Sequence, residues 1–329
     1  MVENKRLRLI IGQIIKKQSI TRKDAVFLSS PQVDIWDLLY GANVIKRHFT
    51  NSKIRLCSII NAKSGDCSED CKFCAQSVFH NTNIKTYPLV NAKIIKKAYD
   101  RAGQMGADGF SIVTSGDTLS DKEVAYLGKI LRELHQRNSN NPYICFSIGH
   151  LTKKHIEELK NAGLTKCHHN LETSRKFFPK ICSTHSYDKR IETIKHLKEA
   201  RVNICSGGVF GIGEKWDDRI DLAFTLKKLN VDSVPLNFLM PIKGTPLGKI
   251  ELLSPIEALR IIALFRYILI DKDIRICAGR EKVLRDLQSL IFYAGANGMM
   301  IGGYLTQLGR TIRYDLQMIK DLGLQRNKL

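Results

Sequence analysis

Short runs of hydrophobic and β-branched residues alternate along this chain with segments of helical periodicity. Each run has the length of a strand and is followed by polar or turn-forming residues. Eight runs can be recognised, at residues 54–60, 109–114, 143–148, 165–171, 202–206, 233–239, 273–277 and 298–302. Strands that alternate with helices are typical of an α/β fold with a parallel sheet.

The segments between the runs carry signals for the starts of helices. Residues 120–137 begin with Ser120 and Glu123 at the spacing of a capping box, and hydrophobic positions then follow on one helix face. Residues 254–269 begin with Ser254 and Pro255, an N-cap followed by proline at the first helical position. Similar hydrophobic stripes occur at residues 188–200 and 216–229.

Eight strands separated by helices predict a (β/α)8 TIM barrel, with a doubly wound parallel sheet as the alternative. Polar and cysteine residues follow the predicted strands, and a barrel brings all these strand ends to one face, where its active site forms. This placement favours the barrel. We predict an N-terminal helical extension at 1–50, with two or three helices on the barrel's outside or bottom, and a barrel domain at 51–329.

The composition excludes some classes of protein. The 329 residues are 43% hydrophobic and 26% charged, which is ordinary for a globular chain. No stretch is long and apolar enough to span a bilayer, and residues 1–19 lack the apolar run and cleavage site of a signal peptide. We therefore expect a cytoplasmic protein without a membrane partner, whose nine cysteines are metal ligands or buried thiols rather than disulfides.

The formal net charge of +20 has two explanations. It could attract an acidic partner, or it could belong to a lysine-rich solvated surface. Lysine and arginine are scattered along the chain, and no zinc-finger, RRM or helix-turn-helix signature accompanies them. The charge alone therefore does not predict a nucleic-acid partner.

Three cysteines follow the first predicted strand within eight residues: Cys67, Cys71 and Cys74. Three thiolates on one loop can bind three irons of a cubane 4Fe–4S cluster and leave the fourth iron without a protein ligand. An open position on a metal can bind a further molecule. The alternatives are a zinc site completed by a distant residue such as His80, and a coincidental grouping.

This loop resembles that of the radical S-adenosylmethionine enzymes. Phe73 matches the aromatic residue that usually precedes the third cysteine, and Gly211-Ile212-Gly213-Glu214 is similar to the family's glycine-rich segment. The resemblance implies a 4Fe–4S cluster whose open iron binds S-adenosyl-L-methionine, and reduction that releases a 5′-deoxyadenosyl radical.

A closer resemblance covers residues 50 to 325. The segments KSGDCSEDCKFCAQS, HHNLETS, CSGGVFGIGE, SVPLNFL, KGTPL, AGRE and AGANGMMIGGYLT resemble, in this order, motifs of the biotin synthase family. The resemblance implies conversion of dethiobiotin to biotin, with sulfur inserted from an auxiliary iron–sulfur cluster. It also implies a homodimer, and a basic face would suit an acidic flavodoxin or ferredoxin as electron donor.

The resemblance assigns site residues by position. The radical-generating cluster would be bound by Cys67, Cys71 and Cys74; the cofactor by Phe73, Glu172 and Arg190; and dethiobiotin by Asn170, Asn237, His168 and Thr306. A guanidinium suits the carboxylate of the cofactor, and an asparagine amide, which both donates and accepts, suits a cyclic urea. Lys63 would lie near the first cluster.

The auxiliary cluster's ligands depart from the common pattern of three cysteines and one arginine. Cys145, Cys205 and Arg275 match, but the remaining cysteine position holds Ser111. Cys277 follows Arg275 by two residues, so both can point to the same face of a strand. Our hypothesis is that Cys145, Cys205 and Cys277 bind the cluster, with Arg275 nearby and Ser111 a poor or absent ligand.

That hypothesis leaves two cluster types open, a 2Fe–2S cluster or a larger four-iron cluster. Cys57, Cys167 and Cys182 match no ligand position and are interpreted as buried thiols.

Two other functions compete. One is a related radical enzyme of hydrogenase-cofactor or pyrrolysine biosynthesis, which need not have cysteines on the third, fifth and seventh strands. The other is a basic iron–sulfur or zinc protein that binds nucleic acid, which would show aromatic residues within basic clusters.

Overall fold

The computed structural model describes residues 5–50, 53–136 and 142–326. Within these ranges the strands form one parallel sheet in the order β5-β4-β3-β2-β1-β9-β8-β7-β6, and β5 also pairs with β7, which closes the sheet into a barrel. The strands are β1 (Arg55–Lys63), β2 (Gly109–Thr114), β3 (Tyr143–Ser147), β4 (Lys166–His168), β5 (Asn203–Cys205), β6 (Gly208–Phe210), β7 (Ser233–Phe238), β8 (Asp273–Ile276) and β9 (Gly298–Met300).

The fifth strand position of the barrel is divided into two pieces. β5 and β6 are separated by Ser206 and Gly207, and both pieces pair with β7. The two pieces together therefore occupy one position of an eight-position barrel in the described part of the chain. The predicted (β/α)8 barrel is confirmed, and the doubly wound alternative is wrong because the sheet has closed.

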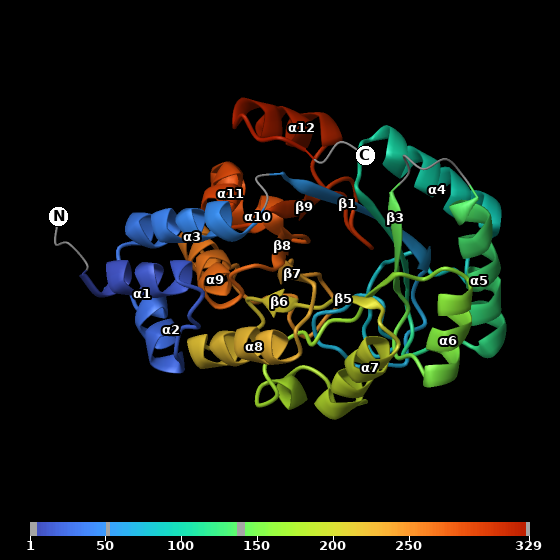
Figure 1. Ribbon diagram of the computed structural model, residues 1–329. Helices are drawn as coiled ribbons and strands as arrows, with labels where there is room; N and C mark the ends of the chain where they lie inside the picture. Colours follow the sequence, from blue (N-terminus) through green and yellow to red (C-terminus); the bar gives the residue numbers. More distant parts are fainter. Residues whose placement is uncertain (1–4, 51–52, 137–141, 327–329) are drawn as a thin grey trace.

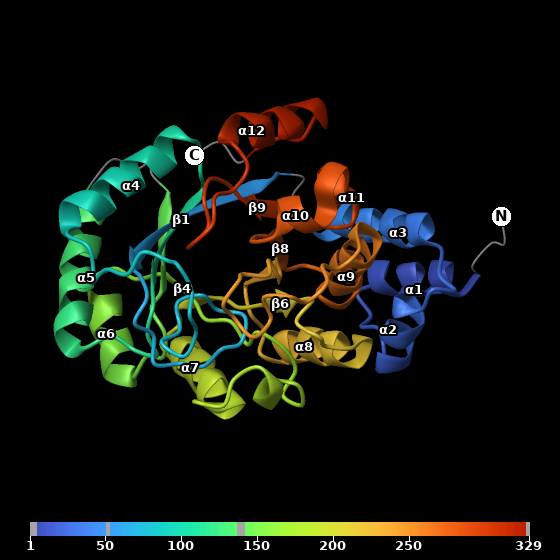
Figure 2. The ribbon, with the colours of Figure 1, turned by 180° about the vertical axis from the view of Figure 1, so that it is seen from behind.

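Helices surround this sheet, with α4 to α9 following the strands around its outside (Figures 1 and 2). The helices are α1 (Lys5–Ile15), α2 (Arg22–Ser29), α3 (Ile35–Phe49), α4 (Ala92–Gln104), α5 (Asp121–His135), α6 (Lys153–Asn161), α7 (Tyr187–Glu199), α8 (Trp216–Lys228), α9 (Pro255–Ile268), α10 (Arg280–Leu284), α11 (Leu290–Tyr293) and α12 (Ile312–Asp321). No helix among the described residues is long and apolar enough to cross a membrane.

The predicted helix starts are confirmed. Ser120 caps α5 and forms the expected reciprocal capping box with Glu123, and Ser254 caps α9. The sequence placed the end of the first of these helices at residue 137, which lies outside the described residues. Local side-chain hydrogen bonds at the N-terminus make these boundaries readable from the sequence.

The N-terminal helices pack against the outer helices of the barrel. α3 lies along α9, and α2 contacts both α8 and α9 (Figure 1). The contact explains why α9 is buried from Ala258 to Ile268, on all its sides. Of the two predicted places for this extension, the outside of the barrel is the one observed.

The C-terminal segment is tied to the barrel through Arg280 and Glu281 of α10. Arg280 is fully buried, and its Nη2 lies 3.0 Å from both carboxylate oxygens of Asp315 in α12. Glu281 accepts hydrogen bonds from the hydroxyl of Tyr304 and from the backbone N–H of Arg310. These bonds position the segment between β9 and α12, which contains Thr306.

Candidate active site

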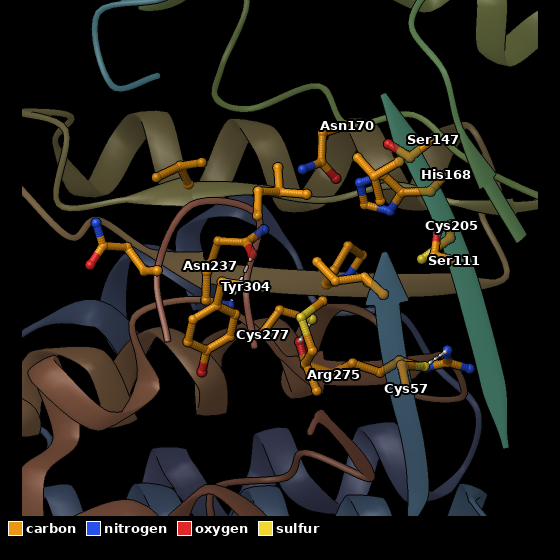
Figure 3. Close-up of a pocket in the computed structure, with 18 of the residues that line it drawn as sticks. Cys57, Ser111, Ser147, His168, Asn170, Cys205, Asn237, Arg275, Cys277 and Tyr304 are labelled. Carbon is orange, nitrogen blue, oxygen red and sulfur yellow. Dashed lines mark hydrogen bonds between the residues drawn. The ribbon is translucent and has the colours of Figure 1, made fainter. Parts of the chain in front are cut away.

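A cavity of about 330 Å³ occupies the interior of the barrel. It is lined by inward-facing strand residues and by the segments that follow β1, β7 and β9, which contribute Phe73 to Gln76, Leu239 to Ile242 and Tyr304 to Gln307. These segments belong to the carboxyl ends of the strands, where barrel enzymes place their active sites. Figure 3 shows side chains from several strands pointing into this one space.

The three-cysteine loop follows β1 at the mouth of the cavity. A backbone bridge between Cys67 and Ser77 holds the loop in a closed turn, and Cys71 is buried. The pKa of Cys74 is raised to about 11, first by burial and then by the nearby Cys67 and Glu172. The pKa of Cys71 is also raised, chiefly by its hydrogen bond with Cys182 and by burial. The raised pKa values keep these two thiols protonated until a metal displaces their protons.

The loop thiols do not form a preassembled zinc site among the described residues. Zinc bound to sulfur at about 2.3 Å would hold its tetrahedral ligands about 3.8 Å apart. Within the described ranges, the one group of three candidate ligand atoms that lie within 4.8 Å of one another is Glu69, Cys182 and His185. The three loop thiols are therefore not all within 4.8 Å of one another. His80, the proposed fourth zinc ligand, has its Nδ1 2.8 Å from the carbonyl oxygen of Cys74.

The predicted cofactor residues of the fourth strand and seventh helix come together. Arg190 on α7 donates from Nη1 to the carbonyl of Asn170 at 2.9 Å and lies 3.8 Å from Glu172 Oε1. Its Nε donates to His185 Nε2 at 3.0 Å, and His185 in turn contacts Glu69 of the cysteine loop. Burial raises the pKa of Glu172, although Arg190 opposes the shift.

Asn170 and Asn237 both line the cavity and both hydrogen-bond the barrel backbone. Asn170 accepts from the N–H of Gly207 at 3.0 Å, and Asn237 accepts from Ala278 at 3.1 Å. Each amide still offers a second N–H and a second lone pair to a bound molecule. Because the first bonds fix the orientation of each amide, the two groups are preorganised.

His168 and Thr306 also line the cavity. Burial lowers the pKa of His168, but the hydrogen bond with Cys205 and the charges of Cys205 and Glu172 together outweigh this effect and raise it overall. The same hydrogen bond lowers the pKa of the Cys205 thiol against the effect of burial. This imidazole therefore favours the thiolate form of Cys205.

The predicted auxiliary-cluster residues all face the cavity: Ser111, Cys145, Cys205, Arg275 and Cys277. Burial raises the pKa of Cys145 and of Cys277 well above that of an exposed thiol. Such thiols are inert until a metal displaces their protons. The structure thus brings together residues from four strand positions that are far apart in the sequence.

The interpretation of the remaining cysteines is partly wrong. Cys57 is only half-buried, and its thiol lines the cavity beside Arg275 (Figure 3). Cys167 is buried as expected, with its thiol 3.3 Å from the carbonyl of Phe146. Cys182 is buried too, but it hydrogen-bonds Cys71 and so belongs to the surroundings of the loop. The two-residue periodicity of β1 was the signal that could have placed Cys57 in the cavity.

Tyr143 was not found from the sequence, and Lys63 has a partner that the sequence did not indicate. Tyr143 lines the cavity and its hydroxyl accepts a hydrogen bond from Arg275 at 2.5 Å. Lys63, expected near the first cluster, forms an ion pair with Glu123 of α5 at 2.9 Å. Neither pairing joins neighbours in sequence, so no local pattern could have indicated it.

Comparisons with known proteins match nearly the whole chain. Residues 63–226 match the radical SAM superfamily model, and residues 235–325 match the Biotin and Thiamin Synthesis associated domain. The biotin synthase of Endomicrobium trichonymphae is 49% identical over 316 residues, which cover 96% of this chain and 97% of that protein. The biotin synthase of Heliobacterium modesticaldum is 50% identical over 299 residues, or 90% of each chain.

Solved structures share the fold at lower sequence identity. The crystal structure of methylornithine synthase has a TM-score of 0.81 and 17% identity, and the match covers 96% of this chain and 97% of that one. Identity at this level is evidence for the barrel architecture and not for a shared reaction.

Proposed function

The chain belongs to the biotin synthase family of radical S-adenosylmethionine enzymes, and from this premise we infer that it converts dethiobiotin to biotin, as a sulfurtransferase of the radical type. The observation that carries this function is a single cavity that joins the three-cysteine loop to a group of inward-facing barrel cysteines. A related radical enzyme would need the first group but not the second.

We propose that Cys67, Cys71 and Cys74 bind a 4Fe–4S cluster, which together with S-adenosylmethionine supplies a 5′-deoxyadenosyl radical when both are bound. Three thiolates match three of the four irons. The donor set fits, because the three thiols lie on one loop, partly or fully buried, and are not all within 4.8 Å of one another.

The residues around the loop are suited to orienting the cofactor. Arg190 keeps its guanidinium near the cavity through bonds to Asn170 and His185, so it can pair with the carboxylate of the methionine part. Glu172 is positioned to accept hydrogen bonds from ribose hydroxyls, and Phe73 lines the cavity beside Cys74.

Dethiobiotin would bind deeper in the cavity. The preorganised amides of Asn170 and Asn237 complement its cyclic urea. His168, at the end of β4 just before Asn170, would contact it too, and Thr306 would lie near its carboxylate. The lining is otherwise largely apolar, which suits an aliphatic chain and excludes water from the radical.

Between these strands we propose an auxiliary iron–sulfur cluster that supplies the sulfur. Cys145, Cys205 and Cys277 would bind it, with Arg275 close by and Ser111 contributing weakly or not at all. The 2Fe–2S and four-iron types both remain compatible with this set.

The remaining expectations concern partners and organisation. We propose a cytoplasmic homodimer that receives electrons from an acidic flavodoxin or ferredoxin and has no nucleic-acid partner. We also propose that residues 1–50 form an extension of the barrel domain at 51–329.

The function is tested by anaerobic reconstitution with iron and sulfide, followed by addition of S-adenosylmethionine, a reductant and dethiobiotin. We expect two clusters per chain, 5′-deoxyadenosine, and biotin. A chain that holds one cluster would contradict the proposal, and deoxyadenosine without biotin would favour a related radical enzyme. A Cys71→Ala variant should lose deoxyadenosine formation and serves as the control.

A further inference from the structure

Cys57 is the cavity cysteine to which no role has been assigned. We infer that Cys57 is a fourth thiolate ligand of the auxiliary cluster, in the same layer of the barrel as Cys145, Cys205 and Arg275. The inference rests on the proposed function, because it requires an auxiliary cluster to be present. Its support comes from the strand register, from the contacts of Arg275 and from the chemistry of Ser111.

The strand register places Cys57 and Cys145 at the same height in the barrel. Side chains in the interior of such a barrel form layers, with alternate strands contributing to each layer. The strands of such a barrel are tilted relative to its axis. In a barrel with eight strands and a shear of eight, a layer therefore moves two residues further along the chain each time it passes to the second strand beyond. Cys57 pairs with Gly109, which pairs with Tyr143, and Cys145 lies two residues beyond Tyr143.

The same step leads from Cys145 to Cys205. Cys145 pairs with Lys166, which pairs with Asn203, and Cys205 lies two residues beyond Asn203. The third strand and the fifth strand therefore contribute thiols to the layer that begins with Cys57.

The third step leads from Cys205 to Arg275. Cys205 pairs with Ser233, which pairs with Asp273, and Arg275 lies two residues further along β8.

From Arg275 the path continues through Gly298 to Arg55, and Cys57 lies two residues beyond Arg55. The path thus returns to its starting residue after a total rise of about eight residues, the shear of this class of barrel. Cys57 is therefore a member of the layer and not an isolated thiol at the edge of the cavity. Cys277, two residues beyond Arg275 on the same face, lies one layer nearer the mouth.

The contacts of Arg275 link this layer member directly to the thiol of Cys57. The Nη1 of Arg275 donates to the Sγ of Cys57 at 2.7 Å (Figure 3). Its Nη2 donates to Asp273 at 3.2 Å. Contacts with Cys57, Tyr143 and Asp273 fix the guanidinium of Arg275 beside this thiol. A guanidinium in this place can donate a hydrogen bond to the sulfur of a cluster ligand.

Ser111 explains why another thiolate is needed. A serine hydroxyl is a much weaker ligand for iron–sulfur clusters than a thiolate, so the usual cysteine position on β2 contributes little here. Cys57 lies on β1, the strand next to β2 in the sheet. Together with Cys145, Cys205 and Cys277 it brings to four the barrel cysteines that line the cavity outside the three-cysteine loop, among the described residues.

Cys167 provides a matched control within the same barrel. It is buried on β4, but its thiol contacts the carbonyl of Phe146 and does not line the cavity. Loss of either thiol removes one buried or half-buried sulfur from a barrel strand. Of the two substitutions, only the one that removes the Cys57 thiol should therefore affect the auxiliary cluster.

The test compares the reconstituted parent with Cys57→Ala, Cys57→Ser and Cys167→Ala by iron and sulfide content and by Mössbauer spectroscopy. Cys57→Ala should fall to about four irons per chain, the content of the radical cluster alone. Its radical cluster should still change its spectrum when S-adenosylmethionine is added, which shows that the barrel has folded. Cys167→Ala should match the parent.

Each other outcome has a separate meaning. A Cys57→Ala protein with the parent's iron content and spectrum would overturn the inference. A parent with a single cluster would instead contradict the proposed function. If Cys57→Ala does not fold, Cys57→Ser decides: a weakened or altered auxiliary cluster supports the inference, and an unchanged one refutes it.

Discussion

Lys46 is a buried amine on α3, far from the cavity. Its Nζ donates to the carbonyl oxygen of Phe292 at 2.6 Å, and its side chain has no carboxylate partner among the ion pairs of the described residues. Burial, together with the charges of Arg266 and Arg47, lowers its pKa from 10.5 to about 8. A single hydrogen bond does not replace the water that the ammonium group loses.

This shift predicts a measurable dependence of stability on pH. Between pH 8 and 10.5 the unfolded chain binds more protons at Lys46 than the folded chain, so stability from this group rises with pH. Relative to Lys46→Met, the parent's free energy of unfolding should increase by up to about 3 kcal/mol across this window, from 2.5 pKa units at about 1.4 kcal/mol each. Denaturant titrations of both proteins at several pH values measure this difference. If the free energies of unfolding of the parent and the variant changed with pH in parallel, the prediction would be refuted.

At the scale of elements, the junction of α3 with α9 attaches the N-terminal extension to the barrel. Gly41 of α3 faces α9, and a Cβ at this position would clash with the hydroxyl of Tyr267. That hydroxyl is buried and donates to the carbonyl of Leu38 at 3.2 Å, so it cannot move without losing its partner. Glycine is required here by close helix packing and not by an unusual backbone angle.

Two glycine substitutions should therefore have opposite effects. Gly41→Ala should destabilise the protein by about 1–3 kcal/mol, because overpacking outweighs the gain in helix propensity. Gly12→Ala in α1 has no atom within 4 Å of the new Cβ and should stabilise it by roughly 0.5–1 kcal/mol. Chemical denaturation of both variants tests the pair. Equal shifts in the free energy of unfolding would show that helix propensity alone determines the effect of both substitutions.

At the scale of the whole molecule, the formal charge of +20 acts over distances longer than any single contact. An acidic electron donor would be attracted before it docks, which raises its association rate. The Debye length falls from about 30 Å to about 10 Å between about 0.01 M and 0.1 M salt, so this attraction is screened.

Reduction by a flavodoxin or ferredoxin should accordingly slow by about tenfold or more over this range of salt. Stopped-flow reduction of the reconstituted clusters at increasing sodium chloride measures the rate. Dithionite, a small reductant of low charge, is the control and should respond less. A flat response with the protein donor would mean that the positive charge serves another purpose.

The sequence by itself determined the barrel, the helix starts and the three-cysteine loop. These depend on local signals: two-residue and 3.6-residue periodicities, the caps at Ser120 and Ser254, and ligands within eight residues. The tertiary structure decided what depends on register between strands. Cys57 looked like an ordinary buried thiol in the sequence, because its neighbours in the layer lie on other strands, at Cys145, Cys205 and Arg275. Only the pairing of β1 and β8 with the two sides of β9 brings a thiol from β1 and a guanidinium from β8 within hydrogen-bonding distance.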